Sequence, residues 1–109
     1  MNETMEIRRD DLLRVLAKRY PDAGQIWYER CTDWLMHVED SRLTPTIQEI
    51  AKDEPISEIP FSGPDGKYYS AVLIMQRRNN NDIIGALQWM VRFFQNPQEA
   101  IYTIDQSFR

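Results

Sequence analysis

The stretch ISEIPFSGPDGKYYSAVLIM, residues 56–75, decides the fold class of this chain. Its centre, Gly63-Pro64-Asp65-Gly66, is typical of a type I turn whose last glycine takes the left-handed conformation and closes a short β-hairpin. Residues 68–75 are dense in aromatic and aliphatic side chains, which favours a buried strand. A helix is the alternative for so short an apolar run, and an all-α fold would follow from it.

Two amphipathic helices are predicted at the start of the chain. The first covers residues 9–20, where apolar side chains recur every three or four positions, and it ends before Pro21. Asp22 can cap the second helix, with Gln25 completing a capping box. The predicted apolar stripe of the second helix consists of Ile26, Trp27, Cys31, Trp34, Leu35 and Val38.

Three further helices are predicted. One covers residues 42–54, because Thr44–Glu49 supplies a proline near the first helical position and a Thr/Glu capping box. Another covers residues 83–94, after a polar break rich in capping residues. The last begins at Asn96-Pro97-Gln98-Glu99, and its apolar stripe is Ile101, Ile104 and Phe108. We therefore expect residues 1–109 to form a single globular domain of the α+β class, helix-rich, with about five helices and one antiparallel hairpin.

Composition excludes several classes of protein. The chain has 109 residues, 42% of them hydrophobic, with three Trp, five Tyr and four Phe, which is the composition of a folded chain. The single Cys31 allows no internal disulfide. The first 11 residues lack the apolar core of a signal peptide, and the longest apolar run, residues 71–75, is far shorter than the roughly 20 residues that span a bilayer. We expect a soluble cytoplasmic protein with no membrane contact.

The sequence supplies no assembled set of catalytic or metal-binding residues. Cys31 and the single histidine, His37, are six residues apart, so on a helix they lie about 600° of rotation apart and on different faces. Gly63 and Gly66 bracket a proline and precede no phosphate-binding motif. The sequence therefore predicts a non-enzymatic protein without a metal or cofactor.

Direct nucleic-acid binding is disfavoured, although Thr46–Ala51 resembles the second helix of helix-turn-helix regulators. Pro55 falls where the turn of that motif expects glycine, and Pro60 would break the recognition helix. Residues 1–56 carry 8 Lys and Arg against 12 Asp and Glu, a balance of −4, whereas phosphate contacts require a basic face. The alternative hypothesis is a winged-helix DNA-binding regulator that uses the 45–53 helix and the 63–66 turn.

A second resemblance concerns the same region. Leu43-Thr-Pro-Thr-Ile-Gln-Glu-Ile50 resembles the Pro-Thr-Ile-x-Glu-Ile segment of small phage proteins that bind or inhibit replicative helicase loaders. In those proteins an early Tyr-Pro and a Trp-bearing helix come before the segment, as Tyr20-Pro21 and Trp34 do here. Those proteins also place an additional helix between the Trp and the Pro-Thr-Ile segment, whereas only Leu35 to Thr44 intervene in this chain. The resemblance implies a class of function, the inhibition of a host replication factor.

Two sets of residues are candidates for partner binding. Acidic residues flank the predicted third helix and would offer a negative surface to a basic protein; they are Glu39, Asp40, Glu49, Asp53 and Glu54. Trp89 and Phe93 belong to an aromatic set that wraps around more than one face of the 83–94 helix. Either part of this set is exposed at an interface, or the helix is central and buried on most sides. Homodimerisation through this helix is compatible with each hypothesis.

The leading hypothesis is a small acidic, non-enzymatic protein that binds and inhibits or adapts another macromolecule. The expected partner is a nucleic-acid-processing protein of a host, and the expected source is a phage or mobile element.

Overall fold

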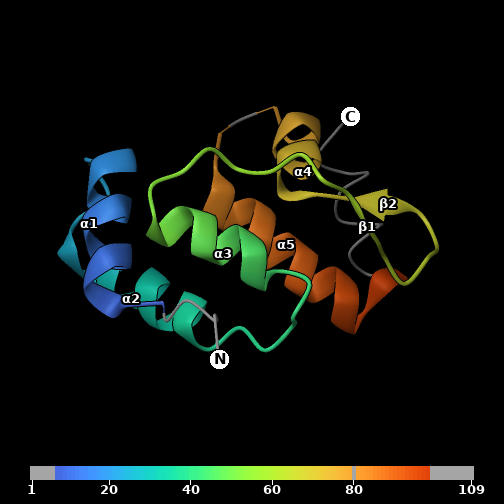
Figure 1. Cartoon of the computed structure of the whole chain (residues 1–109), viewed down its shortest axis with the longest axis horizontal. Helices are drawn as coiled ribbons and strands as arrows, with labels where there is room; N and C mark the ends of the chain where they lie inside the picture. The colour runs from blue at the N-terminus through green and yellow to red at the C-terminus, as the bar shows by residue number, and fades with distance from the viewer. Residues whose placement is uncertain (1–6, 80, 99–109) are drawn as a thin grey trace, which may run out of the picture. The chain divides into compact units, whose positions relative to one another are not determined.

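The computed structural model describes residues 7–79 and 81–98, and this part of the chain forms a small, helix-rich α+β structure (Figure 1). Its elements are α1 Arg9–Arg19, α2 Gln25–Met36, α3 Thr44–Ala51, β1 Phe61–Ser62, β2 Tyr68–Tyr69, α4 Ala71–Arg77 and α5 Ile83–Gln95. They divide between two compact units, with the boundary between Pro55 and Ile56. The α+β class predicted from the 63–66 turn is confirmed.

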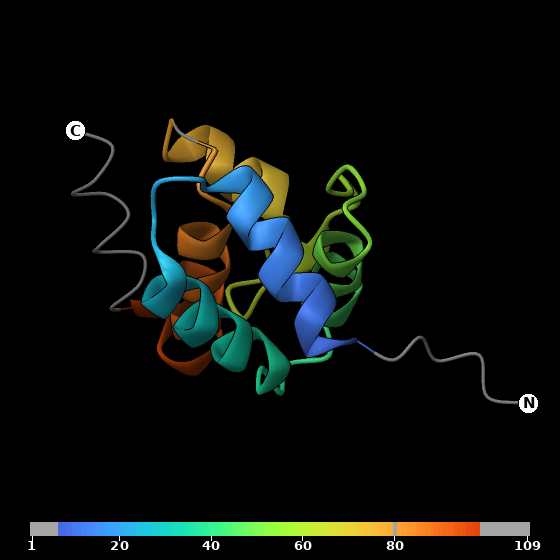
Figure 2. The same cartoon turned by 90° about the vertical axis from the view of Figure 1, so that its left-hand side faces the viewer.

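In the first unit, α1 packs against both α2 and α3 (Figures 1 and 2). Leu12, Val15 and Leu16 form its buried face, at the three- and four-residue spacing that the sequence indicated. Its first turn is acidic and its last turn is basic, which complements the helix dipole. The helix ends at Arg19, with Tyr20 as its C-cap, and so stops before Pro21 as predicted.

The buried face of α2 differs from the predicted stripe by about one position. Its buried residues are Tyr28, Cys31, Thr32 and Leu35. Ile26, predicted to be in the core, is 68% exposed, and Trp27 and Trp34 are only half-buried. Tyr28 can be buried because its hydroxyl donates a hydrogen bond to the main-chain carbonyl of Tyr20.

The starts of α2 and α3 also differ from the predicted capping boxes. Gly24, with φ of 92°, is the N-cap of α2, and no side chain caps that helix. Leu43 is the N-cap of α3, again without a side-chain hydrogen bond, and Pro45 lies in the first turn as predicted. Thr46, predicted to cap α3, lies inside the helix and is buried. Its side chain contributes to packing instead.

In the second unit, the hairpin has the predicted turn. The Gly66 N–H donates to the Gly63 carbonyl at 3.0 Å, and Gly66 has a left-handed φ of 81°. The Gly63 N–H donates to the Lys67 carbonyl at 2.8 Å and closes the loop. Phe61 then pairs with Tyr69 in the antiparallel register. A type I turn followed by a left-handed glycine is confirmed.

Of the two alternatives left open for residues 68–75, the favoured strand is present only at Tyr68–Tyr69, and the helix is the one observed from Ala71. The chain turns into α4 because Ser70 adopts an extended conformation and its Oγ accepts a hydrogen bond from the Leu73 N–H at 3.1 Å. Ala71 and Ile74, three residues apart, are the buried residues of this helix. A side-chain cap and a helical apolar spacing therefore outweigh the β-propensity of the segment.

Helix α5 carries the aromatic core of the second unit. Trp89 and Phe93 are 5% and 0% exposed, and their rings stack with centroids 5.1 Å apart and an interplanar angle of 10°. The Tyr69 ring lies 4.7 Å from that of Phe93. Of the two sequence-based alternatives, the buried central helix is the one observed. After Asn96, Pro97 and Gln98 are helical, as predicted, whereas the predicted apolar stripe of this helix, Ile101, Ile104 and Phe108, lies outside the described residues.

Gly63 generates a prediction about packing. A Cβ atom at this position would lie 2.6 Å from Cε2 of Phe93 and 2.8 Å from Cδ2 of Tyr69, closer than any non-bonded carbon contact. We expect Gly63→Ala to lower the free energy of unfolding by about 1–3 kcal/mol, measured by urea denaturation. Phe93→Leu should relieve part of this overlap, so the double variant should lose less than the two single losses combined. Strict additivity would contradict the overlap.

The buried Tyr69 hydroxyl generates a prediction about pH. Burial, and then the 2.6 Å hydrogen bond to Asp65, raise the pKa of Tyr69 to about 12. Burial opposes ionisation of Asp65, but the bonds from the Tyr69 hydroxyl and the Lys67 N–H outweigh it and hold the pKa of Asp65 below its usual value. Because an unfolded tyrosine has a pKa of about 10, the stability due to Tyr69 is complete below pH 10 and is lost as the pH rises towards 12.

Phenylalanine cannot ionise, so we expect the free energy of unfolding of Tyr69→Phe to fall less than that of the wild type between pH 10 and 12. At pH 12 the two decreases should differ by roughly 2 kcal/mol. Urea denaturation at a series of pH values measures this. Tyr68→Phe is the matched control, because Tyr68 is 68% exposed and its removal should leave the pH dependence unchanged. Parallel curves for Tyr69→Phe and the wild type would show that Tyr69 titrates normally.

Candidate functional site

The acidic residues predicted to bind a partner all lie in the first unit, around α3. Glu39 and Asp40 belong to the connection from α2, Glu49 lies in α3, and Asp53 and Glu54 follow the C-terminal end of α3. The structure therefore places four of them at the two ends of one short helix and Glu49 within it. Their local partners decide how much of their charge is available to another molecule.

Asp40 is compensated by a base two residues away. Its Oδ2 lies 2.7 Å from Nη2 of Arg42, and its Oδ1 accepts from Nε of Arg42 at 2.9 Å. The same Oδ1 accepts from the Arg42 main-chain N–H at 3.0 Å. The hydrogen bonds from the Arg42 side chain are the main cause that holds the pKa of Asp40 below its usual value. Asp40 therefore organises its own loop and offers little net charge.

Asp53 ends α3 through its main chain. It follows the C-cap residue Lys52 and has a left-handed φ of 57°. Its N–H donates to the Ile50 carbonyl at 3.0 Å, and the Glu54 N–H donates to the Glu49 carbonyl at 2.9 Å. These two bonds form a Schellman motif, with aspartate where glycine is commonest. Aspartate is among the non-glycine residues that tolerate this conformation best.

The Asp53 side chain also joins the C-terminal ends of α3 and α1. Its carboxylate forms an ion pair with Lys18 Nζ, and Nη2 of Arg19 lies 3.4 Å from its Oδ1. The same Arg19 nitrogen donates to the Glu54 carbonyl at 3.1 Å. The hydrogen bond from Lys18 is the main cause that lowers the pKa of Asp53. Two bases thus compensate this acid and fix how α1 ends beside α3.

Glu39 and Glu54 remain as exposed carboxylates. Neither side chain has an ion-pair partner within residues 7–79 and 81–98. Glu49, in the body of α3, is half-buried. The five predicted acids therefore do not act alike, since two are compensated by nearby bases and two are exposed without an ion pair among the described residues.

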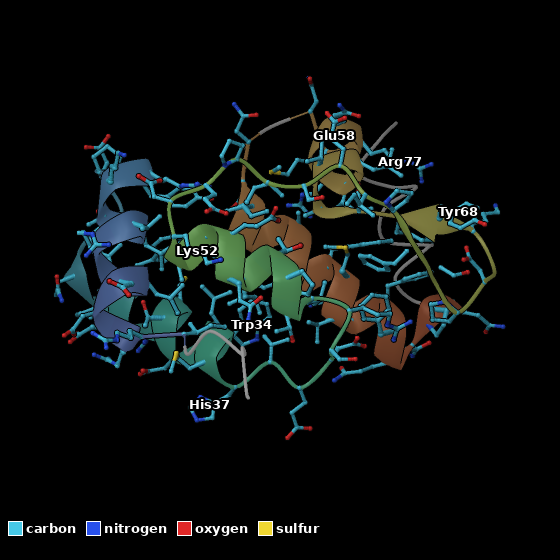
Figure 3. All side chains as sticks on the ribbon, viewed as in Figure 1. Trp34, His37, Lys52, Glu58, Tyr68 and Arg77 are labelled. Atoms are coloured by element: carbon cyan, nitrogen blue, oxygen red, sulfur yellow. The ribbon has the colours of Figure 1, made fainter. Side chains whose placement is uncertain are left out.

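Met36, an exposed apolar residue that the sequence analysis did not single out, precedes Glu39 by three residues. Met36, the last residue of α2, is 40% exposed, and the adjacent His37 is exposed and projects from the helix end (Figure 3). The Nδ1 atom of His37 lies 2.6 Å from the Asp33 carbonyl, so that nitrogen is occupied locally. We call Met36, His37 and Glu39 the helix-end surface. A sequence signal for Met36 was available, because Met36 lies outside the predicted apolar stripe of this helix.

Helix α3, the helix that the winged-helix hypothesis would use, carries no basic side chain. The residues of α3 include Glu49 but no lysine or arginine. Thr46, Ile47, Ile50 and Ala51 are buried. Residues 52–60 form no helix that could follow α3 in a helix-turn-helix. Phosphate contacts on this helix would lack the positive charge that they need.

The second candidate set, Trp89 and Phe93 on α5, is buried. Both residues lie in the aromatic core of the second unit, so in this structure their side chains are not available to a partner.

Among residues 7–79 and 81–98, no group of three His, Cys, Asp or Glu side chains could hold a metal ion. Within the same ranges no helix is long and apolar enough to cross a bilayer.

Comparison with known proteins gives no relative. No family model, curated protein or solved structure matches the chain.

The left-handed conformation and the ion pairs of Asp53 can be separated by substitution. Asp53→Ala should lower the Tm more than Asp53→Asn, because alanine loses the charge and is also strained at φ of 57°, whereas asparagine loses only the charge. Asp53→Gly should recover part of the loss by relieving the backbone. Thermal unfolding by circular dichroism measures all three. Equal losses for the alanine and asparagine variants would show that the ion pairs alone matter.

Proposed function

We propose that this chain acts by binding another protein through the first unit, as a non-enzymatic inhibitor or adaptor. One observation carries the proposal: Met36 and Glu39 are exposed three residues apart at the end of α2, and the Glu39 carboxylate has no ion-pair partner within the described residues. Methionine adapts its shape to varied apolar surfaces, and an uncompensated carboxylate favours a basic partner.

The proposed partner is a host protein that handles nucleic acid, met in the cytoplasm. Such proteins carry basic surfaces for phosphate, which an acidic protein can occupy. The resemblance of Leu43–Ile50 to a segment of phage inhibitors of helicase loaders supports this class and a phage or mobile-element source. In the structure this segment supplies core residues of the first unit, among them Ile47 and Ile50, so its contribution to binding would be to hold the surface in place.

Charge reversal on the helix-end surface tests this function. We expect Glu39→Lys to reduce capture of the partner from the native host by about tenfold, because it replaces an attraction to a basic surface by a repulsion. Capture quantified by mass spectrometry measures the change. Met36→Ser should reduce capture without changing its dependence on salt, since it removes apolar contact and no charge.

Asp22→Lys is the matched control. Asp22 is exposed in the turn between α1 and α2, has no ion-pair partner among the described residues, and undergoes the same change of charge. Capture that Glu39→Lys and Asp22→Lys reduce equally would indicate a general effect of net charge, and the surface assignment would fail. Retention of duplex DNA in a low-salt mobility shift, lost as salt is added, would favour the winged-helix alternative.

A further inference from the structure

We draw no further inference here: the strongest candidate, the groove of about 510 Å³ beside α4 in the second unit, which is lined by Val72, Met75, Gln76, Asn79 and Asn81, carries none because nothing in the structure shows what covers it.

Discussion

The absence of a side chain at Gly63 is the constraint on which the second unit depends. Without a Cβ atom, the turn lies directly against the rings of Tyr69 and Phe93. Tyr69 is thereby held where its hydroxyl reaches Asp65, within the same turn, and its ring reaches Phe93 on α5. One small residue thus links a hairpin with two-residue strands, too short to be stable alone, to the aromatic core of a helix.

The first unit depends on a different kind of contact. The last turn of α1 and the end of α3 are joined by Lys18 and Arg19, which bind the Asp53 carboxylate and the Glu54 carbonyl. Each ion pair is weak on a surface. However, Asp53 is itself the left-handed residue that ends the helix. Charge and backbone geometry therefore stabilise the same turn, which positions the chain where it leaves α3.

The features that sequence alone predicts are those governed by neighbouring residues. The turn at Gly63–Gly66 and the end of α1 before Pro21 depend on local conformational limits, and both are present. The strand favoured for residues 68–75 does not continue beyond Tyr69 because the capping strength of Ser70 competes with a β-rich composition, and the pattern does not rank the two effects. The face of α2 was misplaced because Tyr28 is buried through a bond to the Tyr20 carbonyl, which depends on how two helices meet.

The sequence is equally limited in predicting which acids of the candidate site are paired with bases. The partner of Asp40 is two residues away and visible in the sequence, but the partners of Asp53 lie 34 and 35 residues away and meet it only after α1 packs on α3. Counting charges along the chain therefore overstates the negative surface around α3. Under the proposed function, Glu39 is the acid nearest to Met36 along the chain that lacks an ion pair among the described residues, so recognition there depends on short-range apolar contact together with one charge. A broad acidic field, with its long-range steering, is correspondingly less important.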